Sequence, residues 1–416
     1  MSSLTLDAAR GSGSAVAKRS GGPFFSVLCS ALVVQSLFTF IYHLSGSSTF
    51  YAISNTVAIV FIGYALVVVL RSEYEGSASR AFLVISVVAT FLSVICNLPN
   101  VSMTDVLKYL SLYIFYAAGR CNRTPFRSVE LYCLYALAAL PVAFMAVGTS
   151  KIWEADAFGY FPNANIAVLH FCALLFAAVS VYGNQVILLQ LLNAALMNKI
   201  GAIVATVIAI FMWVVFPLRK ESIISGAVIL TLGVIAFLFG AFDRAIIAFD
   251  GLLFALSLDP RSVTLMSYQE LVQLTGSTDL SGFFRLIHWT NIWELYSGGS
   301  IGTWIFGYGP GETPALTYAG MVPHNDYLRV LVEYGPLNLA IFVCFLAYVR
   351  AALTMGAAKI LFVVLCIYFF SENLLDSFTS MTLFFAYAGR MTAGDVRGIG
   401  TTFEPRLVAM IDRTPP

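Results

Sequence analysis

Charged residues are scarce in this sequence. Lysine, arginine, aspartate and glutamate together make up 11% of the 416 residues, whereas a soluble domain usually carries about 25%. The formal net charge is only +1, which provides no basic surface for a nucleic acid, so we expect no nucleic-acid partner. Hydrophobic residues reach 59% and the mean hydropathy is +0.85. These values exclude an ordinary soluble domain and predict a membrane protein.

Patterns typical of metal and cofactor sites are also missing. The seven cysteines are scattered and lack the paired spacing of a zinc site. None of them falls in the largest polar loop, so we predict no disulfide framework. The glycines of FGYGPG (306–311) follow no predicted strand and are interpreted as a tight turn, not as a nucleotide-binding loop. We therefore expect neither a metal nor a cofactor.

Long uncharged runs are what the sequence has in abundance. A helix needs about 20 apolar residues to cross a bilayer. Hydropathy accordingly predicts an all-α, polytopic integral membrane protein with about twelve transmembrane helices. The predicted spans are 24–44, 50–70, 81–99, 103–119, 131–148, 164–183, 200–218, 222–240, 243–259, 326–349, 357–371 and 377–390.

Basic residues set the predicted orientation. Most of them fall in the short loops and the tail that share one side with the N-terminus, which places both termini in the cytoplasm. The stretch 184–199 is read as an extension of span six, an interfacial helix or an extra span. We reject the extra span because it would invert every charged loop that follows. The chain then divides into a disordered cytoplasmic N-terminus (1–23), spans one to nine (24–259), a large periplasmic loop (260–325), spans ten to twelve (326–390) and a cytoplasmic tail (391–416).

The motif PHND stands where the large loop enters span ten. Asn325 is expected to cap the helix, and Asp326 to face its positive end. Neither role explains His324. It lies beside a helix N-terminus, which favours an anion and keeps the imidazole neutral enough to accept a proton, so His324 is a catalytic candidate. An interfacial side chain without catalytic function is the alternative.

Five further charged residues are candidates for contacts with a ligand. Arg329 and Glu333 lie four residues apart within span ten, where they are either functional groups or a simple ion pair on one helix face. Arg219 and Lys220 form the tight outer turn between spans seven and eight, and snorkelling at a helix end is their alternative role. Arg285 lies in the large loop. Two separate arginines and a histidine would suit a phosphate group, because arginine offers fixed paired donors.

Several of these elements occur together in one known family. Arg285 and Trp289, followed by FGYGPG and by HNDYLRVLVEYG, resemble the signature region of the bacterial O-antigen polymerase and O-antigen ligase superfamily. A proline-asparagine pair before a span, here Pro162 and Asn163, belongs to the same pattern. The resemblance extends over residues 150–416.

The resemblance implies a metal-independent membrane glycosyltransferase without a cofactor. Such an enzyme works at the periplasmic face of the bacterial inner membrane on a glycan linked to polyprenyl diphosphate. Carried onto this sequence, the functional positions of the family are Arg219, Arg285 and His324, although Leu218 stands where the family usually has serine. Arg219 and Arg285 would hold the diphosphate, while His324 would act as a base or orient the acceptor. The residues predicted to contact the substrate around them are Asn325, Arg329, Glu333, Trp289 and Lys220.

Three functions follow from this interpretation. The first is a polymerase that joins repeat units of an exopolysaccharide, capsule or O-antigen. The second is a ligase that transfers a finished glycan to lipid A-core, and the low number of basic residues, 23 in all, favours the polymerase. The third is a transporter or flippase, which would predict an internal repeat and broken helices that the sequence does not show. The expected partners are the lipid bilayer and the lipid-linked glycan, with a chain-length regulator and a flippase as further candidates.

Overall fold

Helices are the only regular secondary structure in the described part of the chain. The structure is a computed structural model that describes residues 23–72, 77–122, 124–147, 159–161, 164–197, 199–215, 266–275, 281–317 and 320–393. The helices are α1 (Phe24–Ser45), α2 (Ser48–Arg71), α3 (Ser77–Asn97), α4 (Met103–Cys121), α5 (Ser128–Ala146), α6 (Ala164–Ala177), α7 (Val179–Tyr182), α8 (Gln185–Leu196), α9 (Ile200–Val215), α13 (Tyr268–Thr275), α14 (Ser281–Ser297), α15 (Ile301–Phe306), α16 (Thr313–Leu316), α17 (Asp326–Tyr334), α18 (Pro336–Ala352), α19 (Gly356–Ser371), the 3-10 helix η1 (Leu374–Asp376) and α20 (Phe378–Met391). Within the described ranges there is no strand, so the all-α prediction is confirmed at this level.

Four helices among the described residues are long and apolar enough to cross a membrane. These are Phe24–Ser45, Ser48–Arg71, Ala78–Asn97 and Ser128–Ala146. Large apolar side chains are exposed on α2 and α3, including Val60, Leu70, Val84 and Phe91. Such a surface is compatible with a lipid environment. The predicted spans 222–240 and 243–259 lie outside the described residues, as do Arg219 and Lys220.

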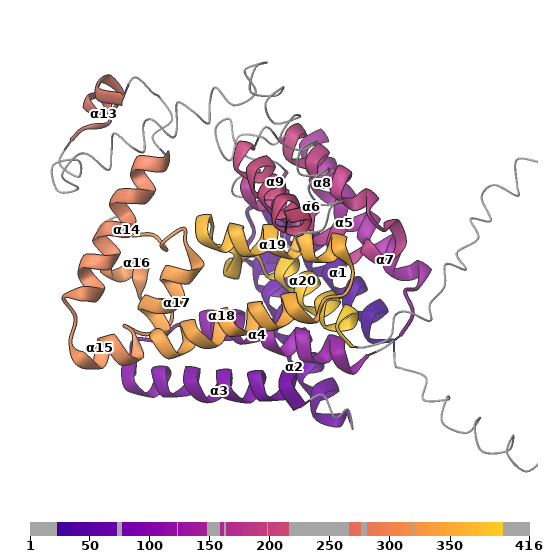
Figure 1. The fold of residues 1–416 in the computed structure, drawn as a ribbon, viewed down its shortest axis with the longest axis horizontal. Helices are drawn as coiled ribbons and strands as arrows, with labels where there is room; N and C mark the ends of the chain where they lie inside the picture. The colour runs from indigo at the N-terminus through magenta and orange to yellow at the C-terminus, as the bar shows by residue number, and fades with distance from the viewer. Residues whose placement is uncertain are drawn as a thin grey trace, which may run out of the picture.

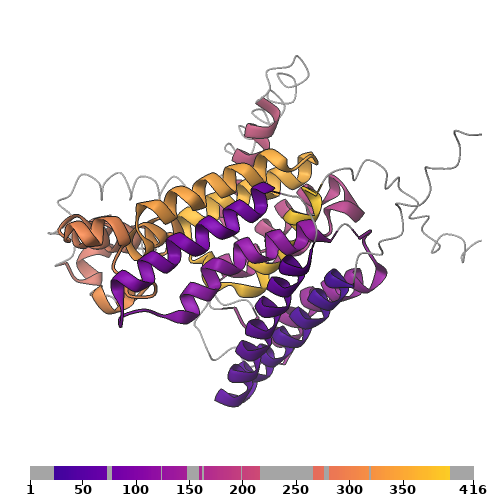
Figure 2. The same ribbon diagram turned by 90° about the horizontal axis from the view of Figure 1, so that it is seen from below.

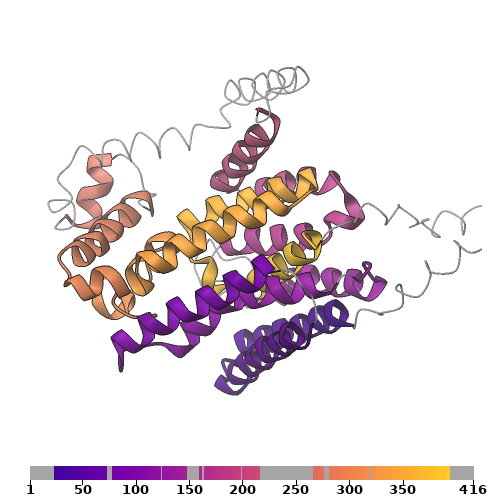
Figure 3. The same cartoon turned by 60° about the horizontal axis from the view of Figure 1, so that its bottom comes forward.

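The core is built around the contact between α4 and α20 (Figure 1). Most of both helices is buried. Gly119 and Gly389 allow the two backbones to approach closely, because a Cβ on either glycine would overlap a backbone oxygen of the facing helix. Small residues at such a contact are typical of helices that pack in membranes. Around this pair, α3 and α18 run side by side (Figure 2), and α1 and α2 form an antiparallel hairpin (Figure 3).

The predicted span ten is broken in the structure. We expected one helix over 326–349, and that expectation is wrong, because α17 ends at Tyr334 and α18 begins at Pro336. Proline lacks a backbone donor and disfavours helical geometry in the preceding residue. Gly335 takes a left-handed φ of 87°, and a Cβ there would overlap the backbone oxygen of Ile305 in α15. The break therefore lets α15 pack directly against the chain between the two helices.

The stretch 184–199, for which we rejected an extra span, contains a helix of its own. This helix, α8, has 12 residues. That length is short of the approximately 20 residues that a span requires. It is separated from α6 by the short helix α7 and by Gly183.

Candidate functional site

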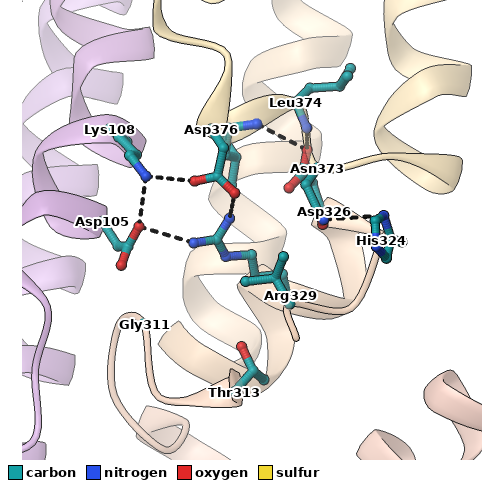
Figure 4. Close-up of polar contacts among 12 residues, drawn as sticks. Asp105, Lys108, Gly311, Thr313, His324, Asp326, Arg329, Asn373, Leu374 and Asp376 are labelled. Carbon is teal, nitrogen blue, oxygen red and sulfur yellow. Dashed lines mark hydrogen bonds and ion pairs between the residues drawn. The ribbon is translucent and has the colours of Figure 1, made fainter. Parts of the chain in front are cut away.

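The PHND motif is anchored to the segment that connects α19 with α20. Asn325 caps α17 as predicted, since its side chain accepts a hydrogen bond from the backbone N–H of Leu328 at 3.0 Å. Asp326 lies in the first turn but is completely buried, and its Oδ2 accepts hydrogen bonds from the backbone N–H groups of Leu374 (2.6 Å) and Leu375 (3.1 Å). These bonds attach the start of α17 to η1 (Figure 4).

His324 lies between these anchored residues in an unusual backbone conformation. Its φ is 52°, in the left-handed region that residues other than glycine rarely adopt. Its Nδ1 is 3.2 Å from Nδ2 of Asn373 (Figure 4). Backbone strain of this kind costs about 1–3 kcal/mol and persists where the surroundings hold the residue in place. Here the Asn325 cap and the Asp326 bonds provide that support.

The surroundings of His324 favour its neutral form. Burial lowers the pKa of His324, and the nearby positive charge of Arg285 lowers it further, as does the neighbouring imidazole of His288. The carboxylate of Asp376 acts in the opposite direction without reversing the shift. The imidazole is therefore neutral near pH 7, as a proton acceptor must be.

One face of α14 holds the chain just before His324. Arg285, His288 and Trp289 have the spacing that places side chains on the same side of a helix. The indole N–H of Trp289 donates to the carbonyl of Pro323 at 2.6 Å, and Nε2 of His288 is 3.2 Å from the carbonyl of Val322. Trp289, which we predicted to contact substrate, thus bonds to the protein backbone and positions the PHND motif.

Arg285 is held near His324 by an ion pair with the buried carboxylate of Glu372. Its Nη2 lies 2.8 Å from Oε1 of Glu372, whose side chain is 2% exposed. Burial raises the pKa of Glu372, while the positive charge of Arg285 and a hydrogen bond from Asn165 oppose the rise. The Arg285 side chain is itself 30% exposed. Glu372 therefore orients a guanidinium group that keeps part of its surface accessible to an anion.

Arg329 is the buried centre of a cluster of charged side chains (Figure 4). Its Nε is 3.2 Å from Glu333, its Nη1 is 3.0 Å from Asp376, and its Nη2 is 3.0 Å from Asp105. Lys108 adds contacts of 2.6 Å to Asp376 and 3.2 Å to Asp105. Arg329 is only 2% exposed. We predicted that Arg329 and Glu333 either bind substrate or pair with each other, and the geometry favours the pairing.

The same cluster holds the glycine-rich turn. Glu333 Oε2 accepts a hydrogen bond from the backbone N–H of Gly311 at 3.0 Å, and Oε1 accepts one from the hydroxyl of Thr313. The backbone N–H of Gly309 donates to the carbonyl of Glu333 at 3.0 Å. The backbone N–H of Glu312 also donates to the carbonyl of Gly309 at 3.3 Å, so the predicted tight turn is found at residues 309–312, while Phe306 still belongs to α15. The backbone donors of this segment bond to α17.

A cavity of about 1020 Å³ opens beside these residues. Its lining includes the imidazole of His324 and the ionisable side chains of Lys108, Glu372 and Asp376. Asp376 stays ionised: burial alone would raise its pKa, but Arg329 and Lys108 outweigh burial and lower it. Within the described part of the chain, no group of three or more histidine, cysteine, aspartate and glutamate side chains is arranged to hold a metal ion.

Several residues of the site were not predicted. Glu372, Asn373 and Asp376 lie in the short connection between the last two predicted spans, and Lys108 and Asp105 lie on α4. The signal available in the sequence was SENLLDS (371–377), a polar run between two apolar helices on the same predicted face as PHND. Nothing local linked it to His324. Arg219 and Lys220 lie outside the described residues, so their predicted roles stay predictions.

No protein-family model matches the chain, and no curated protein matches it either.

Proposed function

We propose that this chain is a membrane glycosyltransferase that joins oligosaccharide repeat units carried on polyprenyl diphosphate. The observation that carries the proposal is that Arg285 lies near enough to His324 for its charge to lower the pKa of that histidine, although the two are far apart in sequence. His324 and Glu372, the carboxylate partner of Arg285, both line one cavity. The guanidinium of Arg285 suits an anion, and the imidazole of His324 can accept a proton. The proposal includes twelve spans in the bacterial inner membrane, cytoplasmic termini and a site at the periplasmic face.

The reaction needs no more than these two chemical functions. A hydroxyl oxygen of the acceptor sugar attacks the anomeric carbon of the donor glycan and forms the new C–O bond. The bond from that carbon to the diphosphate oxygen breaks, and the polyprenyl diphosphate leaves with the electron pair. His324 takes the proton of the attacking hydroxyl. Arg285 stabilises the charge that develops on the leaving diphosphate, and we assign the same role to Arg219.

The polymerase is favoured over the ligase by the sparse basic residues of the chain, 23 lysines and arginines in all. The lining of the cavity adds to this argument, because Lys108 already pairs with Asp105 and Asp376. A phosphorylated core acceptor would require further cations. The broken helix at Gly335 is a feature that transporters also have. The experiment must therefore distinguish all three functions.

The deciding measurement is the glycan of a deletion strain, separated by size and by carrier. A polymerase deletion leaves single repeat units at the cell surface, and the wild-type gene restores long chains. Long chains that accumulate on the polyprenyl carrier would identify a ligase instead. Repeat units confined to the cytoplasmic face would identify a flippase. Either of the last two outcomes would overturn the polymerase.

Asn373 provides a test of how His324 acts. If the amide N–H of Asn373 donates to Nδ1, the imidazole hydrogen is on Nε2. If instead the amide oxygen accepts from Nδ1–H, Nε2 is free to act as a base. This oxygen has no hydrogen-bond partner among the described residues. A base requires the second arrangement. Asn373→Asp supplies only acceptor oxygens, so we expect it to keep activity and to move the acidic limb of the pH profile to higher pH. Asn373→Leu should lower kcat by about 10²-fold or more.

The pH profile of Asn373→Asp separates positioning from simple packing. A change in packing would lower activity equally at all pH values. If purified Asn373→Asp unfolds at the same temperature as the wild type but has no activity at any pH, His324 donates a hydrogen bond through Nε2, and its assignment as a base is wrong.

A further inference from the structure

The first two helices carry an unusual set of neutral polar residues. Both are long and apolar enough to cross a membrane, yet five polar side chains on them line the cavity. These are Gln35, Ser36, Thr39, Ser54 and Asn55. Polar groups inside a span are costly, and they are retained where they face the protein interior or a water-filled cavity. Their position on one wall therefore calls for an explanation beyond helix packing.

Some of these polar side chains form hydrogen bonds within the protein. The hydroxyls of Thr39 and Ser54 are 2.9 Å apart, and Thr39 also donates to the carbonyl of Gln35 at 3.1 Å. The hydroxyl of Thr379 donates to Oε1 of Gln35 at 2.8 Å. These bonds attach the hairpin of α1 and α2 to the beginning of α20, next to the ionisable side chains that line the cavity.

Two side-chain amides on this wall still have atoms free for hydrogen bonding. Among the described residues, no hydrogen bond is found to the side chain of Asn55 or to the amide nitrogen of Gln35. Asn55 is exposed on α2 and lines the cavity. An amide both donates and accepts hydrogen bonds. These two amides can therefore bond to a ligand in the cavity.

Aromatic rings complete the same wall. Tyr42 and Tyr51 lie with ring centroids 5.2 Å apart at the end of the hairpin, and the rings of His43 and Tyr160 are stacked at 6.2 Å. All four line the cavity. Rings grouped in this way present flat apolar surfaces beside hydrogen-bonding side chains.

We infer that this wall, formed by Gln35, Thr39, Tyr42, Tyr51 and Asn55, binds the neutral sugar rings of an oligosaccharide. Sugar hydroxyls both donate and accept hydrogen bonds, and the apolar faces of sugar rings pack against aromatic side chains. The inference rests on the proposed function and names the part of the substrate that lies beyond the diphosphate.

The side chains of this wall suit neither an acidic sugar nor a lipid chain. The described lining residues of α1 and α2 include no lysine, arginine, aspartate or glutamate, so an acidic sugar would find no counter-ion there. A polyprenyl chain would leave the Asn55 amide unpaired. The cavity of about 1020 Å³ is at the upper end of sites for drug-sized ligands, about 300–1,000 Å³, and accommodates more than one sugar ring.

The test is binding of the free oligosaccharide to the purified full-length chain in detergent. The probe is the repeat unit released by mild acid from the carrier lipid of the deletion strain, so it has no diphosphate. We expect it to raise the Tm of the wild type and of His324→Ala alike. Asn55→Leu and Gln35→Met should weaken the binding by about tenfold each. Thr56→Val, a polar-to-apolar change on α2 that does not line the cavity, should bind like the wild type.

The outcomes separate this inference from the proposed function. If the oligosaccharide leaves every Tm unchanged and Asn55→Leu makes normal polymer, the sugar-binding wall is wrong, whatever His324→Ala does. If polyprenyl phosphate raises the Tm of the wild type but not of Asn55→Leu, the wall holds lipid and the inference also fails. If the oligosaccharide binds as expected but His324→Ala makes normal polymer, the wall stands and the proposed reaction falls.

Discussion

Replacing His324 by alanine is expected to abolish long-chain glycan while leaving the fold intact. The imidazole lines the cavity, and its Nδ1 lies 3.2 Å from Asn373. Loss of a general base lowers a rate by about 10²–10⁴-fold. The measurement is the rate of repeat-unit joining by the purified chain, together with the glycan profile of complemented cells at equal protein levels. If His324→Ala has wild-type activity, the PHND motif serves only as a helix cap and His324 is not catalytic.

The pH dependence of the wild type follows from the same residue. Burial, the positive charge of Arg285 and the neighbouring imidazole of His288 lower the pKa of His324 below its ordinary value of 6.5. A base acts in its unprotonated form, so activity is expected to be complete above this lowered pKa and to fall as the pH drops through it. Arg285→Ala removes the positive charge that helps to lower the pKa. Its remaining activity should therefore show an acidic limb shifted to higher pH.

Replacing Arg329 by methionine is expected to destabilise the protein by about 3–5 kcal/mol. Arg329 is 2% exposed and contacts three carboxylates, from Glu333, Asp376 and Asp105. Without the guanidinium these carboxylates lie together with Lys108 as the remaining cation of the cluster. Removal of one partner leaves buried charge uncompensated, which is the reason for the large effect. The measurement is thermal and denaturant unfolding of the purified chain.

Arg350→Met is the matched control for this change. Arg350 is exposed in the last turn of the neighbouring helix α18, where its loss should cost less than about 1 kcal/mol. If Arg329→Met unfolds like Arg350→Met but loses glycan transfer, Arg329 is a substrate ligand and not a structural ion pair. Loss of stability together with loss of activity is the expected result.

Local features of the sequence were predictable because they depend on neighbouring residues alone. The helical class follows from the long apolar runs. The Asn325 cap, the turn at 309–312 and the pair of Arg329 with Glu333 each involve residues within a few positions of one another. The break at Gly335 was not predicted, although Gly335 and Pro336 are a local signal for it, because the hydropathy is continuous across these two residues. Apolar composition does not distinguish one long helix from two shorter ones.

What only the tertiary structure decided is which distant residues meet. Lys108 on α4, Asn373 beyond α19 and Asn55 on α2 have no local pattern that connects them with His324. Their meeting depends on how helices pack, and above all on the close approach of α4 and α20 at Gly119 and Gly389. The sequence by itself determined that the chain forms apolar helices and that PHND begins one of them. Packing decided that His324, two members of the ion cluster (Lys108 and Asp376) and the neutral polar residues of α1 and α2 line a single cavity, because side chains far apart in sequence converge only when their helices are in contact.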